Sequence, residues 1–183
     1  EISGLIGLDQ NNMARDLESS FSDAFNADGA KGVVALINSP GGSPVQSGQL
    51  YRALRELKRT HPDKPLLAVI SDIGASGAYY IAAAADEIFV DPASIVGSIG
   101  VVSSGFGFVE TLGKLGIERR LVTAGDHKGM LDPFSPADLA DQKILQSILD
   151  DIHAQFIAAV EEGRGSRLQA GPELFSGRVW SGR

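Results

Sequence analysis

Two short apolar runs, each followed by a helix-forming segment, constrain the fold of this chain most strongly. The runs are KGVVALIN (residues 31–38) and PLLAVIS (residues 65–71), and both are rich in aliphatic and β-branched residues. Because they lack an alternation of polar and apolar positions, they predict strands that are covered on both faces. Strands that alternate with helices are joined by right-handed crossovers, so the sequence predicts an α/β fold with a mainly parallel sheet flanked by helices.

Amphipathic periodicity marks the helices of the first half. Residues 11–27 carry an apolar residue at every fourth position after a candidate asparagine cap, and residues 77–85 (GAYYIAAAA) also favour a helix. Residues 43–58 begin with Ser43 as the cap, Pro44 at the first helical position and Gln46 in place to close a capping box. The first half therefore predicts the order β, α, β, α with short joints.

The second half gives weaker local signals, except near its end. Residues 86–90, 100–104 and 119–124 predict short strands, and residues 107–116 predict a helix between the last two. The longest helix is expected from Ser135 to Gly163, with Pro136 and Asp138 in its first turn. Residues 161–173 (EEGRGSRLQAGPE) predict a mobile loop.

The length of 183 residues fits one domain with a sizeable core, so we expect a single domain over residues 1–183. The chain begins at Glu1 without a methionine and stops soon after GRVW, which predicts a segment trimmed at both ends. It contains neither a signal peptide nor the 18 consecutive apolar residues that a membrane span needs.

Charge and composition exclude several classes of function. The formal net charge of −7 leaves no basic stripe for phosphates, so nucleic acid is not an expected partner. The chain has no cysteine, which excludes disulfides, thiolate metal sites and a cysteine nucleophile. Its three histidines, His61, His127 and His153, do not have the spacing of metal ligands. We therefore expect neither a metal nor another cofactor.

Ligand sites of open α/β sheets form where strands end and helices begin, and two such joints stand out. INSPGGS (residues 37–43) has paired glycines that allow close approach of a ligand to the backbone. SDIGASGAYY (residues 71–80) places Ser76 among glycines and alanines, next to helix N-terminal amides that could hold an oxyanion. Ser76 is therefore a candidate nucleophile, although a serine at this position is also a common helix cap.

A serine nucleophile needs a base, and the segment AGDHKGMLDPFS offers two. His127 could act beside Asp126, which would give a Ser, His and Asp arrangement. Lys128 could act if the glycines and apolar residues around it keep water away, because only a neutral amine accepts a proton. A solvated lysine paired with Asp126 or Asp132 is the other interpretation of Lys128. The local pattern leaves these alternatives open.

Taken together, NSPGGS, GASGAYYIAAAADEI, GSIGV, AGDHK followed by PF, and ELFSGRVWSG resemble the SppA-type signal peptide peptidases. These are serine peptidases with a Ser-Lys dyad on the fold that ClpP and the crotonases share, and the resemblance runs in order from about residue 31 to residue 180. It implies that Ser76 is the nucleophile, Lys128 is the general base and Ser98 orients the lysine. It also implies that the oxyanion is held by backbone amides, and the glycines concerned are Gly41, Gly42 and Gly77.

The resemblance implies partners and a location as well. Members of the family bind extended peptides such as cleaved signal peptides, and they assemble into homo-oligomeric rings in which neighbouring subunits can complete the dyad. A membrane anchor ahead of the catalytic part, absent from this sequence, would place the full-length protein at the bacterial inner membrane. The catalytic part itself is expected to be soluble.

Three rival functions share parts of this pattern. A phage-type capsid maturation peptidase would use the same dyad on assembly proteins. A crotonase-type acyl-CoA hydratase or isomerase would need catalytic glutamates, and neither Glu87 nor Glu110 lies in a suitable context. A non-catalytic assembly domain would keep the fold without the base, whereas Lys128 is present.

Overall fold

The computed structural model describes residues 1–7, 13–169 and 171–183. These residues form two compact units. Unit 1 comprises residues 1–101 and 153–183, and unit 2 comprises residues 102–152. The expectation of one domain stays a prediction. The asparagine cap expected ahead of the first helix lies outside the described residues.

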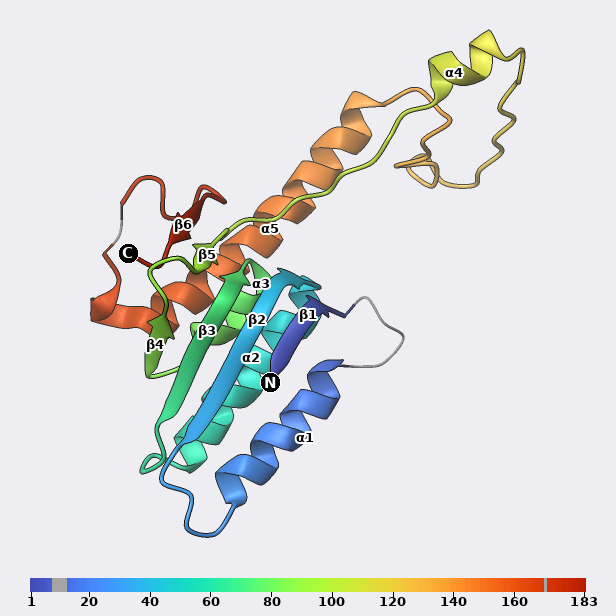
Figure 1. Ribbon diagram of the computed structural model, residues 1–183. Coiled ribbons are helices and arrows are strands. Elements are labelled where there is room, and N and C mark those ends of the chain that lie inside the picture. The colour runs from blue at the N-terminus through green and yellow to red at the C-terminus, as the bar shows by residue number, and fades with distance from the viewer. Residues whose placement is uncertain (8–12, 170) are drawn as a thin grey trace. The chain divides into compact units, whose positions relative to one another are not determined.

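The described part of unit 1 is built on a six-stranded sheet in the order β1-β2-β3-β5-β6, with β4 also paired to β3 (Figure 1). The pairs β1–β2, β2–β3, β3–β4 and β3–β5 are parallel, and β5–β6 is antiparallel. This arrangement confirms the predicted α/β fold with a mainly parallel sheet. The strands are β1 (Ile2–Ile6), β2 (Val33–Gly42), β3 (Leu66–Ala75), β4 (Glu87–Val90), β5 (Ile95–Gly97) and β6 (Val179–Ser181).

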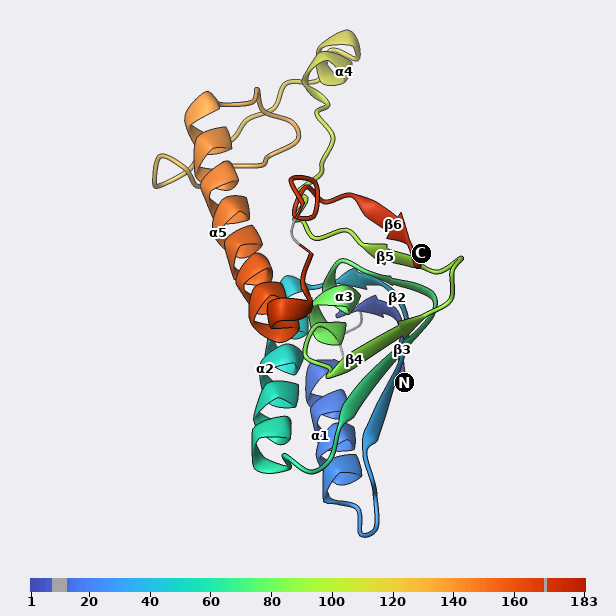
Figure 2. The ribbon, with the colours of Figure 1, turned by 90° about the vertical axis from the view of Figure 1, so that its left-hand side faces the viewer.

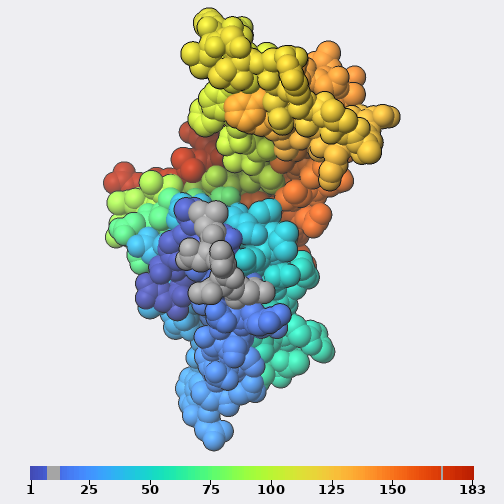
Figure 3. Space-filling view, turned by 90° about the vertical axis from the view of Figure 1, so that its right-hand side faces the viewer, coloured from blue at the N-terminus to red at the C-terminus, as the bar shows by residue number. Residues whose placement is uncertain are grey.

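Helices cover one face of this sheet, as Figure 2 shows for α1, α2 and α3. The surface of α1 is seen in blue on the side shown in Figure 3. Within unit 1, residues 153–164 of α5 add Phe156 and Val160 to the core, and both are buried. The helices of this layer are α1 (Met13–Asn26), α2 (Pro44–Thr60), α3 (Gly77–Ala82) and the second part of α5 (Leu139–Arg164).

The opposite face of β2 is open, so the prediction that its strand is covered on both faces is wrong. Along β2, buried and accessible residues alternate, and Val34 and Leu36 keep 53% and 48% of their surface exposed. Leu36, Val69 and Phe89 lie side by side on three strands. The alternation was hidden in the sequence because aliphatic side chains occupy both faces.

Three aromatic rings join α2, α3 and α5 in the core of unit 1. The rings of Tyr80 and Phe156 stack with centroids 4.6 Å apart, and the ring of Tyr51 lies 5.5 Å from that of Tyr80. The Tyr51 hydroxyl donates to the carbonyl of Ala159 at 2.9 Å. Burial, helped by the charge of Glu162, raises the pKa of Tyr51 to about 12, so the hydroxyl remains a hydrogen-bond donor well into the alkaline range.

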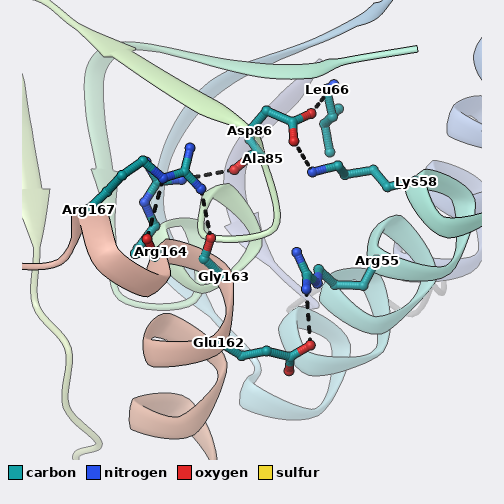
Figure 4. A network of polar contacts seen from close by, with 9 residues as sticks. All are labelled: Arg55, Lys58, Leu66, Ala85, Asp86, Glu162, Gly163, Arg164 and Arg167. Carbon is teal, nitrogen blue, oxygen red and sulfur yellow. Dashed lines mark hydrogen bonds and ion pairs between the residues drawn. The ribbon is translucent and has the colours of Figure 1, made fainter. Parts of the chain in front are cut away.

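A polar network closes the end of the sheet where β3 begins (Figure 4). Asp86 accepts a hydrogen bond from the backbone amide of Leu66 at 2.8 Å and forms an ion pair with Lys58. Burial alone would raise the pKa of Asp86, but the hydrogen bonds from Lys58 and Leu66 lower it overall. Arg164 of α5 donates to the carbonyl of Ala85 at 2.8 Å. These contacts tie α2 and α5 to the turn ahead of β4.

The start of α2 follows the sequence signal in part. The Ser43 side chain accepts a hydrogen bond from the Gln46 amide at 3.3 Å, which confirms the cap. The reciprocal half of the capping box is wrong, because Gln46 Oε1 accepts instead from the amide of Ala14 at 3.1 Å. The Ser43 amide donates to the carbonyl of Ile6. Gln46 therefore joins α2 to α1, a tertiary contact that overrides the local motif.

Unit 2 departs most from the sequence-based expectations. Helix α4 (Val109–Lys114) lies within the predicted segment 107–116, and this prediction is confirmed. The strands predicted at residues 100–104 and 119–124 are wrong, since both segments lack regular structure. Val102 and Val122 keep 83% and 95% of their surface exposed. Their β propensity alone does not form a strand, because neither valine packs against a neighbouring strand.

The boundaries of α5 also differ from the prediction. The helix begins at Leu139 instead of Ser135, because Asp138 precedes it and accepts hydrogen bonds from the amides of Ala140 and Asp141 at 2.7 and 3.1 Å. At its other end the helix continues to Arg164 and is followed by the 3-10 helix η1 (Gly165–Arg167). The predicted loop at residues 161–173 is therefore wrong for its first seven residues.

Candidate active site

Ser76 occupies a strained turn between β3, which ends at Ala75, and α3, which begins at Gly77. Its backbone angles are φ 53° and ψ −126°, a conformation that residues other than glycine rarely adopt. Its side chain forms no capping hydrogen bond, so the interpretation of Ser76 as a helix cap is not supported. A sharp strand-to-helix turn of this kind holds a hydroxyl out for reaction.

The NSPGG segment at the end of β2 packs directly against this turn. A methyl group added to Gly41 would lie 2.7 Å from the Gly77 nitrogen and 2.8 Å from Ser76 Cβ, which is too close for any side chain. Gly41 itself has φ 103°, a backbone conformation that favours glycine. Glycine at position 41 is therefore what allows the two joints predicted from the sequence to meet.

Two backbone amides lie beside the Ser76 turn. The Gly77 amide is at the first position of α3, where no intrahelical acceptor exists. A methyl group on Gly77 would lie 3.3 Å from the Gly42 nitrogen, so the two residues are close neighbours at this turn. The Gly41 amide instead donates to Oγ of the fully buried Ser39 at 3.1 Å. Gly42 and Gly77 thus remain as candidate oxyanion donors, and Gly41 contributes close packing.

Ser98 directly follows β5, the strand whose last residue is bonded to Ser76. The Ser76 amide donates to the carbonyl of Gly97 at 2.8 Å, and Ser98 follows directly. Ser98 has φ 53°, the same left-handed value as Ser76, and its amide donates to the carbonyl of Arg178 at 2.7 Å. Strands β5 and β6, which hold Ser98 here, were not predicted, because IVG and VWS are too short to show a periodicity.

Lys128 lies in unit 2, within a series of turns. Its amide donates to the carbonyl of Gly125 at 3.2 Å, and its side chain is exposed. Asp132 is bonded to Arg119 at 3.2 Å and to Ser135 instead of Lys128. Lys128 and Ser76 belong to different units, so the dyad stays a prediction.

His127, the rival base, is paired with a carboxylate other than the one expected. Its Nδ1 lies 2.5 Å from Oδ1 of Asp141, at the start of α5, and not against the neighbouring Asp126. Asp141 gave no sequence signal of its own, since the pair joins a loop to a helix across intervening turns. Unit 2 thus contains a His–Asp pair directly beside the predicted lysine in the sequence.

The contact between α3 and α2 at this site gives a testable prediction about stability. A methyl group on Gly77 would lie 2.4 Å from Oγ of the fully buried Ser47, so Gly77→Ala should lower the free energy of unfolding by about 2 kcal/mol. In the double variant with Ser47→Ala, the nearest Ser47 atom left is Cβ, at 3.4 Å. Urea denaturation should therefore show that adding Gly77→Ala to Ser47→Ala costs much less free energy of unfolding than adding it to the parent.

The matched control is Ser47→Ala by itself, which removes the hydrogen bond from Ser47 Oγ to the Ser43 carbonyl. This variant should lose about 1 kcal/mol. Strictly additive losses in the double variant would show that the two side chains do not compete for the same space.

The sequence matches peptidase family S49 over residues 58–183. The Na(+)/H(+) antiporter NhaA of Brucella melitensis is 49% identical over 166 residues, which are 91% of this chain and 22% of that protein. A protein of Enterococcus faecium, provisionally named signal peptide peptidase SppA, is 32% identical over 83% of this chain and 44% of its own length. The chloroplastic serine protease SPPA of Arabidopsis thaliana is 29% identical over 84% of this chain and 22% of its own length.

The chain thus spans less than half the length of each of these three relatives. Most of the antiporter lies outside the matched segment, so its name does not indicate the function of this chain. The matched family covers β3, the Ser76 turn, Ser98 and Lys128. The chain therefore belongs to peptidase family S49, the family of the SppA-type serine peptidases.

Proposed function

We propose that this chain is the catalytic part of a serine endopeptidase in which Ser76 is the nucleophile and Lys128 the general base. The observation that carries the proposal is the conformation of Ser76: a strained, uncapped serine with the amides of Gly42 and Gly77 beside it. Strain of this kind persists where the surrounding structure enforces it, and it is concentrated at active sites.

The proposed reaction follows from these groups. Neutral Lys128 takes the proton of the Ser76 hydroxyl, and the serine oxygen attacks the scissile carbonyl carbon to form a tetrahedral intermediate. The amides of Gly42 and Gly77 donate hydrogen bonds to the oxyanion. The intermediate expels the amine, which takes the proton from Lys128, and water then releases the acyl group from Ser76. The Ser98 hydroxyl orients the Lys128 amine.

The state of Lys128 connects this mechanism to assembly. A lysine must be shielded from water to stay neutral, and Lys128 is exposed in the single chain. None of residues 102–152 is buried, so unit 2 cannot form a core by itself. Its most exposed large apolar side chains are those of Val102, Phe106, Leu115, Val122, Leu131 and Leu139. We propose that further copies of the chain cover this surface and Lys128 in a homo-oligomeric ring.

The proposed substrates are extended peptides, with cleaved signal peptides as the leading candidates. The name of the Enterococcus faecium relative supports this choice. Of the described residues, none lies in a helix with the length and apolar character needed to cross a bilayer. A membrane anchor in the full-length protein therefore stays a prediction that the resemblance alone supports.

The rival enzyme classes differ in the residues that they require. A crotonase-type hydratase or isomerase would need glutamates at the oxyanion site, whereas Glu87 lies on β4 and Glu110 on α4 of unit 2. A capsid maturation peptidase would use the same Ser76 and Lys128, so only its substrate would distinguish it.

Incubation of the purified chain with a fluorogenic signal peptide and, separately, with an acyl-CoA tests the proposal. We expect peptide cleavage and no acyl-CoA turnover, and size-exclusion chromatography should show the activity in an oligomeric fraction. Turnover of the acyl-CoA without peptide cleavage would refute the peptidase assignment. Cleavage of a capsid assembly protein with no cleavage of signal peptides would favour the maturation peptidase.

A further inference from the structure

The segment that carries Lys128 has no helix or strand of its own. Residues 121–138 are held by overlapping turns, in which the amides of Lys128, Met130 and Asp132 donate to carbonyls three residues earlier at 3.1–3.2 Å. Leu131 has φ 68°, an unfavourable conformation for a residue other than glycine. A loop that holds such a conformation needs fixed points on both sides.

The downstream fixed point is Asp132. Its carboxylate accepts hydrogen bonds from Arg119 Nε at 3.2 Å and from the Ser135 hydroxyl at 2.6 Å. The amide of Phe108 donates to the carbonyl of Pro133 at 2.7 Å. These contacts lie entirely within unit 2 and fix the loop four residues after Lys128.

The upstream fixed point is His127. Its Nδ1 lies 2.5 Å from Oδ1 of Asp141, in the first turn of α5, and the Asp141 amide in turn donates to Asp138 at 3.1 Å. The Asp141 side chain is 20% exposed and that of His127 is 53% exposed. Across residues 121–131, all of which are described, this is the only side-chain hydrogen bond to another part of unit 2. The bond therefore ties the loop to α5 at the residue that immediately precedes Lys128.

We propose that His127 is a positioning residue whose hydrogen bond to Asp141 fixes the loop that presents Lys128. This inference rests on the proposed function, since the position of Lys128 matters for catalysis only if Lys128 is the base. His127 itself takes no proton in the reaction. Its imidazole fixes the backbone next to Lys128, and thereby the position of the Lys128 Cα atom.

Steady-state kinetics of peptide cleavage by His127→Phe, Asp141→Ala and the double variant test this role. We expect kcat to fall about tenfold or more in each single variant with KM changed less than twofold, because a misplaced base slows the chemical step without weakening peptide binding. The double variant should be no slower than the single ones, since both remove the same bond. His127→Gln, which can still donate to Asp141, should recover much of the rate.

His61→Gln is the matched control, because His61 is bonded at the end of α2 in unit 1. It should keep kcat within twofold of the parent. The proposal is overturned if His127→Phe keeps the parental kcat, if the losses in the double variant multiply, or if His127→Gln is as slow as His127→Phe. Complete loss in every His127 variant together with an active Lys128→Ala would make His127 the base and would also overturn it.

Amide hydrogen exchange separates this inference from the proposed function. Exchange at residues 125–132 should accelerate in His127→Phe and Asp141→Ala and stay unchanged in His61→Gln. If Lys128→Ala remains fully active, the proposed dyad fails, whereas the exchange data still report whether His127 fixes the loop. Unchanged exchange in both His127→Phe and Asp141→Ala would show that the bond does not hold the loop, which overturns the inference even if the dyad is correct.

Discussion

Replacement of Ser76 by alanine is expected to lower kcat for peptide cleavage by about 10⁴-fold or more. The hydroxyl is the attacking group in the proposed reaction, and no other side chain at the turn offers a nucleophile. Within unit 1 the Ser76 side chain forms no capping bond, so its removal should leave the fold intact. A fluorogenic peptide assay measures the rate. Ser3→Ala, at an exposed serine of β1, is the control and should retain parental activity.

The same position makes a second measurement possible. Because glycine adopts positive φ at little cost, Ser76→Gly should be more stable than the parent by about 1 kcal/mol while it is equally inactive. Urea denaturation monitored by far-UV circular dichroism compares the three proteins. An active Ser76→Ala would refute the nucleophile, and a Ser76→Gly less stable than Ser76→Ala would show that the turn is not strained.

Lys128→Met is expected to lower kcat by about 10³-fold or more, since an unassisted serine hydroxyl is a weak nucleophile at neutral pH. Lys128→Arg should not restore the rate, because a guanidinium stays protonated and cannot accept the serine proton. Initial rates of peptide cleavage compare the parent with both variants.

Lys143→Met, at an exposed lysine of α5 in unit 2, is the matched control and should stay fully active. Lys128 forms no ion pair with the described residues of its unit, so its replacement should change the free energy of unfolding by less than about 0.5 kcal/mol. Full activity in Lys128→Met would exclude the lysine as base.

The sequence predicted those parts of the fold that local patterns determine. The periodicity of residues 11–27, the Ser43 cap and the apolar run before Ser76 identified α1, α2 and β3, because each signal lies within one element. Strands β5 and β6 were missed because each has three residues and pairs with a distant segment, as Ile95 does with Ser181. Gln46 shows the same limit, since its side chain bonds Ala14 instead of closing a local capping box.

In the candidate site, too, the features set by local sequence were predictable and those set by distant contacts were not. The glycines of NSPGG and the serine of GASGA were recognisable because a close backbone approach and a sharp turn each demand small residues. The use of the Gly41 amide by Ser39 and the pairing of His127 with Asp141 were not recognisable, because both depend on where separate segments meet. The exposure of Lys128 likewise depends on contacts that its local sequence does not encode.

The bond between the Ser76 amide and Gly97 has a consequence for biosynthesis. Gly97 belongs to β5, whose other neighbour in the sheet is β6, and β6 is the last of the six strands to leave the ribosome. We expect the reactive turn to gain its full support only when β6 has paired, because contacts between distant segments form late. A nascent chain would then lack a fully supported nucleophile until residues 179–181 have emerged and paired with β5.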